Sequence, residues 1–329
     1  MLSTLKRLGG RVFAPAVPDP PWMREFAARG KRWNPASVRA PWFERRDALR
    51  HAGGVARRHG LGEQGEHWLR HWVEQGYFVV KGAVDPEAAR RYADEFEQVW
   101  WMDAPVPGLT LSDVTIAGEY HVHISHDKLL SYGVEQRREA HGQSNWRVGE
   151  FYQSSKAAEA IYRDARLAKI SSAILDTLAV PHFSLSFSKG SRQGLHQDTC
   201  VFHVWPRNAL IGVWIAAEDI SPASGPLEYY PGSHREPIFE AFKNYPQTQR
   251  RTAPQPLAAK YDEYVRDVAV KYPREVFLAK TGDALFWHGM LIHGGASVED
   301  PATTRKSMVI HYMPEGANRG HEVEGPFNW

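Results

Sequence analysis

The stretch that decides the fold runs from Gly194 to His234 and reads GLHQDTCVFHVWPRNALIGVWIAAEDISPASGPLEYYPGSH. It begins with His196 and Asp198, two residues apart, in a run of Thr, Cys, Val, Phe and Trp that predicts a strand over 194–204. Successive side chains of a strand point to opposite faces, so residues two apart share a face. An imidazole and a carboxylate at this spacing can therefore reach one metal ion.

A third ligand must come from another part of the chain, and GDALFWHGMLIHGG over 282–295 offers two histidines. His288 and His293 are five residues apart, so they cannot both face inward on one regular strand. We prefer His293, because the two glycines after it let a strand end approach a metal closely, and His288 is then a supporting or structural histidine. Two histidines and one carboxylate form the facial arrangement that binds non-haem Fe(II) and leaves positions open for other ligands.

The strand over 194–204 also predicts what lies beside these ligands. If the strand is unbroken, the face that carries His196 and Asp198 continues to Cys200, while His203 points the other way and is a poor ligand. Cys200 is then either a small buried side chain or part of the pocket wall. Both alternatives place the thiol inside the protein, next to the metal site.

The next strand, predicted over 209–218, has two unlike faces. One face combines large and small side chains and leaves empty volume, whereas the other is uniformly branched. A metal ion and a small diacid inside a barrel would require that volume. The residues expected on the inner face are Leu210, Gly212, Trp214 and Ala216.

Arg305 begins the last predicted strand, 305–313, and shares a face with Ser307 and His311. An arginine at such a position is commonly solvated or paired with a surface acid. If this face is the inner one, however, no protein carboxylate is near in the sequence. The guanidinium would then favour a ligand carboxylate, which it can hold with two parallel hydrogen bonds.

Composition sets the class of protein. The chain has 329 residues, 43% of them hydrophobic, enough to bury one large or two modest cores. No run approaches the roughly 18–20 apolar residues of a membrane helix, no secretory signal is evident, and a cytoplasmic location is expected. A single cysteine excludes an intramolecular disulfide. Neither the GxxxxGK[ST] phosphate loop nor the GxSxG motif of serine hydrolases occurs.

Residues 1–60 form a basic N-terminal arm with 13 Lys or Arg against 4 Asp or Glu. Its charges alternate with Pro and Trp, which is not typical of an amphipathic helix or a nucleic-acid motif. We expect an extension that wraps over the domain. Contact with an anionic substrate, a carrier or another subunit is the alternative.

The rest of the chain, 61–329, is expected to be one domain with a helical front over 61–180. Helical patterns end at Gly76, follow the N-cap candidate Asp85 and Pro86, and break near Asp164. The segment 103–150 predicts mainly loop, and 235–272 predicts a partly helical insertion that could act as a lid. The short strands predict a mainly β jelly-roll core with flanking helices; they are 77–81, 182–189, 194–204, 209–218, 226–230, 274–279, 283–288, 290–293 and 305–313.

These segments together resemble the phytanoyl-CoA dioxygenase family of Fe(II)- and 2-oxoglutarate-dependent oxygenases. The resemblance covers roughly residues 70–315 and rests on HQD, VWIAAEDIS, GPLEYYPGSH, GDALFWHGMLIHGG and TTRKSMVIHY. It implies a double-stranded β-helix (cupin-like) core, Fe(II) as the metal, and 2-oxoglutarate and O2 as cosubstrates. It also implies hydroxylation of an unactivated C–H bond with release of succinate and CO2.

By this resemblance, His196, Asp198 and His293 would bind iron and Arg305 would bind the distal carboxylate of 2-oxoglutarate. Gln197 and Trp214 would lie beside the cosubstrate. One departure concerns Gly295, where many relatives have a serine whose hydroxyl contacts 2-oxoglutarate. Ser307 or Ser186 is the expected replacement.

The substrate does not follow from the resemblance, because family members act on very different small molecules. We expect a small-molecule substrate, anionic or carrier-tethered, with neither nucleic acid nor membrane as partner. The alternatives are a jelly-roll binding protein without turnover and a cupin-type metal enzyme that does not use 2-oxoglutarate. Candidate pocket residues, besides Cys200, are His121, His123, Trp146, Arg147 and His311.

Overall fold

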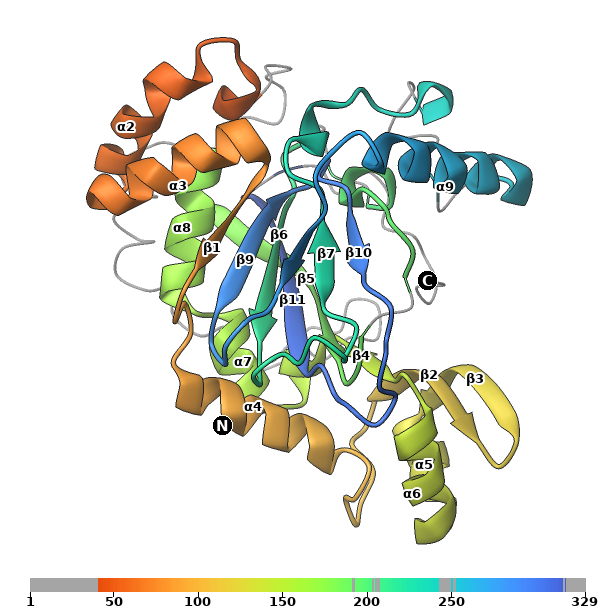
Figure 1. Cartoon of the computed structure of the whole chain (residues 1–329). Helices are drawn as coiled ribbons and strands as arrows, with labels where there is room; N and C mark the ends of the chain where they lie inside the picture. The colour runs from red at the N-terminus through yellow and green to blue at the C-terminus, as the bar shows by residue number, and fades with distance from the viewer. Residues whose placement is uncertain are drawn as a thin grey trace, which may run out of the picture.

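The computed structural model describes residues 41–190, 193–202, 204, 208–242, 250, 253–315 and 317. Two antiparallel sheets form the core (Figure 1), one of eight strands in the order β1-β9-β6-β11-β5-β4-β2-β3 and one of three in the order β10-β7-β8. Strands far apart in the sequence are neighbours in both sheets, as in a jelly roll. The strands are β1 (Tyr77–Val80), β2 (Thr110–Ile116), β3 (Glu119–Ser125), β4 (Arg147–Gly149), β5 (Ala179–Phe187), β6 (Ile211–Ala216), β7 (Leu227–Tyr229), β8 (Glu275–Phe277), β9 (Ala284–His288), β10 (His293–Gly295) and β11 (Ser307–Pro314).

Helices cover one face of the large sheet (Figure 1). Asp85 caps the N-terminus of α4 by accepting hydrogen bonds from the backbone N–H of Glu87 and Ala88, as its position before a proline predicts. Asp164 caps α8 in the same way, at the predicted break. The helices of at least seven residues are α2 (Ala48–Arg58), α3 (Gly62–Gln75), α4 (Pro86–Gln98), α6 (Val134–Gln143), α7 (Lys156–Tyr162), α8 (Ala165–Leu175) and α9 (Gln255–Ala269), and α5 (His126–Leu130) is shorter.

The two faces of β6 separate two hydrophobic cores. Ile211, Val213 and Ile215 pack in the core under the helices. Trp214 and Ala216 point the other way, into the core between the two sheets. The alternation predicted for this strand is therefore confirmed, and the space between the sheets is where the candidate site lies.

Three local predictions are wrong. Residues 103–150 are not mainly loop, since they form β2, β3, β4, α5 and α6. The strand over 194–204 is interrupted, because among the described residues of this segment only His196 makes a β-bridge, and a 3-10 helix starts at Asp198. Residues 48–58 of the predicted arm are helical and carry Ala52 and Val55 into the helix-side core. The remainder of the arm, 1–40, lies outside the described residues.

The predicted insertion over 235–272 contains α9, whose Tyr261 and Val265 are fully buried. They form a third hydrophobic cluster with Cys200 and Phe242. The helix therefore covers the segment that follows Asp198. Within the described residues, no helix combines the length and the hydropathy that crossing a membrane requires.

Gly76 ends α3 in a left-handed conformation with φ 81°, and a Cβ there would lie 2.5 Å from Nδ1 of His234. Gly76→Ala should therefore lower the free energy of unfolding by about 2–4 kcal/mol, from backbone strain and overpacking together. Gly82 is the matched control, since it also has a positive φ, 55°, but an added Cβ would meet nothing within 4 Å. Gly82→Ala should cost about 1–2 kcal/mol in the same urea denaturation experiment. Equal losses would show that the contact with His234 is irrelevant.

Candidate active site

Three predicted metal ligands meet between the two sheets. The ligand atoms of His196, Asp198 and His293 all lie within 4.8 Å of one another, and no other such group of three occurs in the part of the chain that the structure describes. Nε2 of His196 is 3.5 Å from Oδ1 of Asp198, and Nε2 of His293 is 3.6 Å from the same oxygen. Three donors from two distant segments thus converge on one point.

Backbone hydrogen bonds hold the two histidines side by side. The amide of His196 donates to the carbonyl of His293 at 2.9 Å, and the amide of His293 donates back at 3.1 Å. In each ring Nδ1 donates to a carbonyl two residues earlier, Gly194 for His196 and Leu291 for His293, both at 2.9 Å. These bonds fix the tautomer and leave Nε2 free to bind a metal.

Asp198 is buried, and one of its oxygens is already occupied. Oδ2 accepts hydrogen bonds from Nε1 of Trp287 at 2.7 Å and from Nε2 of His311 at 3.0 Å. Burial raises the pKa of Asp198, but the histidines around it lower the pKa more, to well below its ordinary value. The carboxylate is therefore ionised, with Oδ1 directed at the two histidines.

The ionisation state of His293 is also suited to metal binding. Burial lowers the pKa of His293 to about 4, although the Asp198 carboxylate opposes this shift. The imidazole is therefore neutral at pH 7 and can donate a lone pair. Two imidazoles and one carboxylate are a donor set that fits Fe(II).

Gly212 makes room for the hydrogen bonds to Asp198. It lies in β6 directly opposite Trp287 of β9 on one side and His311 of β11 on the other. A Cβ at Gly212 would lie 2.0 Å from the Trp287 ring. The volume that this glycine leaves, which the sequence assigns to a metal and a small diacid, is therefore filled by an indole. Trp214 faces the space between the sheets, as predicted, but lies two residues further along β6 than Gly212.

Arg305 is fully buried near Trp214, with its guanidinium carbon 5.9 Å from the indole centroid. Nη1 donates to the carbonyl of Gly225 at 2.9 Å, whereas Nε has no hydrogen-bond partner among the described residues. Burial lowers the pKa of Arg305 to about 10, so the side chain is still charged at neutral pH. A buried cation without a protein carboxylate fits an acidic ligand.

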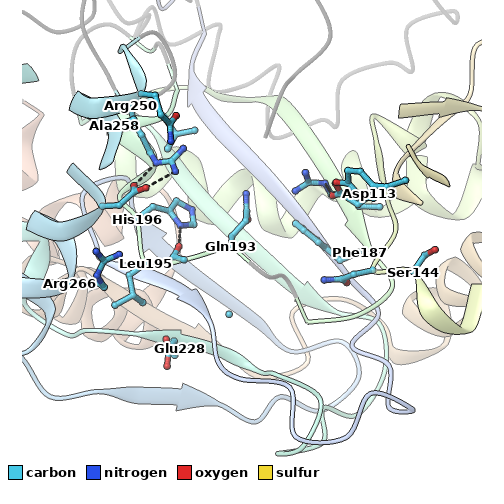
Figure 2. Close-up of a pocket in the computed structure, with 18 of the residues that line it drawn as sticks. Asp113, Ser144, Phe187, Gln193, Leu195, His196, Glu228, Arg250, Ala258 and Arg266 are labelled. Atoms are coloured by element: carbon cyan, nitrogen blue, oxygen red, sulfur yellow. Dashed lines mark hydrogen bonds and ion pairs between the residues drawn. The ribbon is translucent and has the colours of Figure 1, made fainter. Parts of the chain in front are cut away.

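A cavity of about 840 Å³ opens beside His196 (Figure 2). Figure 2 shows Arg250 and Asp113 on opposite sides of this pocket, with His196 and Gln193 between them. Of the predicted pocket residues, Arg147 lines this cavity, whereas Trp146 is stacked on Phe96 in the helix-side core. Of the two neighbours in sequence, only the arginine can therefore meet a substrate.

Two predicted neighbours of the iron and its cosubstrate are placed elsewhere. Gln197 donates through Nε2 to the carbonyl of Met290 at 3.0 Å, and its backbone N–H donates to the hydroxyl of Tyr261. Cys200 is fully buried in the α9 cluster, as the alternative of a small buried side chain predicts, and belongs neither to the ligand group nor to the lining of the cavity described above. The reason is the 3-10 helix that starts at Asp198, which ends the strand parity on which the prediction for Cys200 rests.

The remaining predicted residues are also placed. His121 and His123 lie on β3, where His123 contacts the hydroxyl of Ser112, and they do not join the ligand group. His288 contacts Glu44 through Nε2 at 2.8 Å, as a structural histidine would. The hydroxyl of Ser307 donates to the carbonyl of Arg305 at 3.3 Å. His203 lies outside the described residues.

Ser186 is a poor replacement for the serine expected at position 295. Its neighbours Leu185 and Phe187 face the core between the sheets, so Ser186 faces the helices. Trp287 was not identified from the sequence, although it contacts Asp198 directly. The signal was available in principle, because a glycine directly opposite a tryptophan in a sheet marks a close approach of the large side chain.

Two packed antiparallel sheets with a metal-ligand group between them define a cupin-like jelly-roll protein. Solved structures confirm this fold. The α-ketoglutarate-dependent epimerase SnoN from nogalamycin biosynthesis has a TM-score of 0.53 at 15% identity, over 80% of this chain and 92% of that one. EctD from S. alaskensis with bound Fe has a TM-score of 0.55 at 16% identity, over 90% of this chain and 84% of that one.

The family follows from the sequence. The model of the phytanoyl-CoA dioxygenase (PhyH) family matches residues 72–306, and the chain belongs to this family, as its motifs predict. Peroxisomal phytanoyl-CoA dioxygenases of Rattus norvegicus and Homo sapiens are 26% identical over 242 residues and 23% identical over 252 residues. Each alignment covers 73% of this chain, but 66% of the relative.

Trp287→Phe tests the hydrogen bond to Asp198. Loss of the indole N–H should weaken Fe(II) affinity by about 10–100-fold, because Oδ2 loses one of its two donors and the carboxylate is no longer held in place. The measurement is an anaerobic Fe(II) titration against a competing chelator. Trp72→Phe is the control, since Trp72 is equally buried and its Nε1 has no hydrogen-bond partner among the described residues. Unchanged affinity in Trp287→Phe would contradict this role.

Proposed function

We propose that the protein is an Fe(II)- and 2-oxoglutarate-dependent dioxygenase that hydroxylates an unactivated C–H bond of a small molecule. One observation carries this proposal: a group of two histidines and a carboxylate occurs together with Arg305, a buried guanidinium that no protein carboxylate neutralises within the described residues. A metal site alone would fit many functions. The added cation selects a dicarboxylate as the companion of the metal.

In this proposal His196, Asp198 and His293 hold the iron on one side. Bound Fe(II), with 2-oxoglutarate and O2, would supply oxidation of the C–H bond, with release of succinate and CO2. The protein contributes two imidazoles that donate through Nδ1 to backbone carbonyls, and a carboxylate whose second oxygen is held by Trp287 and His311. These contacts keep the ligands oriented before any substrate arrives.

Arg305 would bind the distal carboxylate of 2-oxoglutarate through Nε, which has no hydrogen-bond partner in the described part of the chain. Trp214 lies beside the guanidinium and would form part of the wall around the cosubstrate. Ser307, the first residue of β11 and two residues after Arg305, is the proposed replacement for the hydroxyl missing at Gly295. Burial of Arg305 excludes water from this end of the site, which strengthens its interaction with a carboxylate.

Arg305→Met tests the cosubstrate site. The wild-type protein with Fe(II) and 2-oxoglutarate under anaerobic conditions should show a weak visible charge-transfer band, and Arg305→Met should raise the 2-oxoglutarate concentration needed for it by at least 100-fold, because the carboxylate loses a charge-assisted bidentate partner. Arg137→Met is the control, since Arg137 is also buried but donates to the carbonyl of Trp100.

Absence of this band in the wild-type protein, together with no succinate formation in air, would contradict the assignment. It would favour a jelly-roll binding protein or a cupin-type metal enzyme. A normal band in Arg305→Met would show that 2-oxoglutarate is held by other groups.

A second set of variants tests the ligands. His196→Ala and Asp198→Ala should each abolish retention of Fe(II) after desalting, because two donors cannot hold the ion tightly. His288→Ala should retain it, since His288 contacts Glu44 and not the ligand group. Iron content is measured on protein whose folding is confirmed by circular dichroism. Equal loss in all three variants would overturn the ligand assignment.

A further inference from the structure

Asp113 has an unusual backbone in the middle of a strand. Its φ is 60°, a left-handed conformation that costs energy in a residue other than glycine. The pairing of β2 with β3 has the same register on both sides of Asp113 but is not formed at Asp113 itself. Strain of this kind at a pocket is a reason to look for function.

The conformation of Asp113 shifts the alternation of β2. Leu111 and Val114, three residues apart, both pack in the helix-side core, which a regular strand would not allow. As a result Asp113 and Thr115 line the pocket. The strained residue therefore directs a carboxylate toward the space beside His196.

Asp113 is part of a polar group on this wall. Its Oδ2 lies 2.8 Å from Nε of Arg147, and its Oδ1 accepts a hydrogen bond of 2.6 Å from the hydroxyl of Tyr120. Arg147 is largely buried, and burial lowers the pKa of Arg147 while Asp113 raises it. Acceptor and donor groups thus stand next to each other at the pocket surface.

The opposite wall of the pocket also carries a pair of one arginine and one aspartate. Arg250 holds Asp262 of α9 with two hydrogen bonds, of 2.6 and 2.9 Å (Figure 2). By residue type the described lining is otherwise mostly polar, although its exposed surface is divided about equally between polar and apolar atoms; its apolar side chains are Phe187, Leu195, Val201, Ala253 and Ala258. A long saturated chain in this space would remove water from ion pairs on both sides without replacing their hydrogen bonds, which is unfavourable.

We infer that the substrate is a polar molecule rich in hydroxyl or similar hydrogen-bonding groups, bound between the Asp113–Arg147 and Arg250–Asp262 pairs, and not a fatty acyl chain. This rests on the proposed function, because the substrate must reach a metal at His196. A hydroxyl both donates and accepts, so it can bind a carboxylate and a guanidinium at the same time. The names of the relatives point to an acyl thioester, but the pocket of this chain favours different chemistry.

The first test asks which molecules increase 2-oxoglutarate consumption. A metabolite extract from the cells that contain the protein is divided into water-soluble and chloroform-soluble fractions, the water-soluble fraction is freed of acyl-CoA thioesters by reversed-phase extraction, and phytanoyl-CoA is tested beside them. The water-soluble fraction should raise consumption at least fivefold, and the other two should have no effect. Stimulation by the chloroform fraction or by phytanoyl-CoA, or none by the water-soluble fraction, would overturn the inference.

The second test uses Asp113→Asn, which keeps the size of the side chain and tolerates a positive φ. Loss of the charge should raise the half-saturating amount of the water-soluble fraction by about tenfold, with a smaller effect on the maximal rate. Asp176→Asn is the matched control, because Asp176 also has a positive φ, 50°, and an arginine partner, Arg58, but does not line the pocket. The half-saturating amount should be unchanged there.

Equal shifts in both variants, or no shift in Asp113→Asn, would show that Asp113 has only a structural role. Failure of the proposed function would look different. In that case the anaerobic band of 2-oxoglutarate with Fe(II) is absent in the wild-type protein, whichever fraction is added.

Discussion

The two backbone hydrogen bonds between His196 and His293 are the constraint on which the site depends. They join a segment that precedes a 3-10 helix to the first residue of β10, and so bring two imidazoles together from distant parts of the chain. The rings need no further support from the metal, since each Nδ1 has its own carbonyl partner. β10 and the segment at His196 are thus required in place before the two imidazoles meet, which ties metal binding to folding.

Asp198 completes the group in an asymmetric way. Its Oδ2 is held by Trp287 and His311, which stand on either side of Gly212 in the sheet, while Oδ1 faces the histidines. A side chain at position 212 would push the indole away. One glycine in a central strand therefore determines which carboxylate oxygen is available to a metal, although it touches no ligand itself.

Much of this could be predicted, and the limits are physical. The inner face of β6 follows from strand parity, because parity depends on backbone geometry alone. The candidate ligands follow from residue type and spacing, since the strand that was expected to carry two of them ends at Asp198. Strand parity fails where the backbone forms hydrogen bonds with another segment. The amide of Thr199 donates to the carbonyl of Gly289, and the hydroxyl of Tyr261 accepts from the amide of Gln197. Such contacts turn the chain at Asp198. They involve residues far away in the sequence, so the local residue pattern does not predict them. The same reason explains why Cys200 is in the α9 cluster.

Family membership and the pocket constrain function at different levels. The metal ligands and Arg305 lie inside the two-sheet core, where the fold dictates their positions. Phe187 of β5, Glu228 of β7 and Gly295 of β10 line the pocket from the core, and the rest of its wall comes mainly from β2, β4 and α9 at the margins (Figure 1). Because these elements can change without disturbing the metal site, the core fixes the reaction and the margins select the substrate. A strained aspartate in β2 is a costly feature to keep in a wall that only had to be apolar, and this favours a substrate whose polar groups Asp113 recognises.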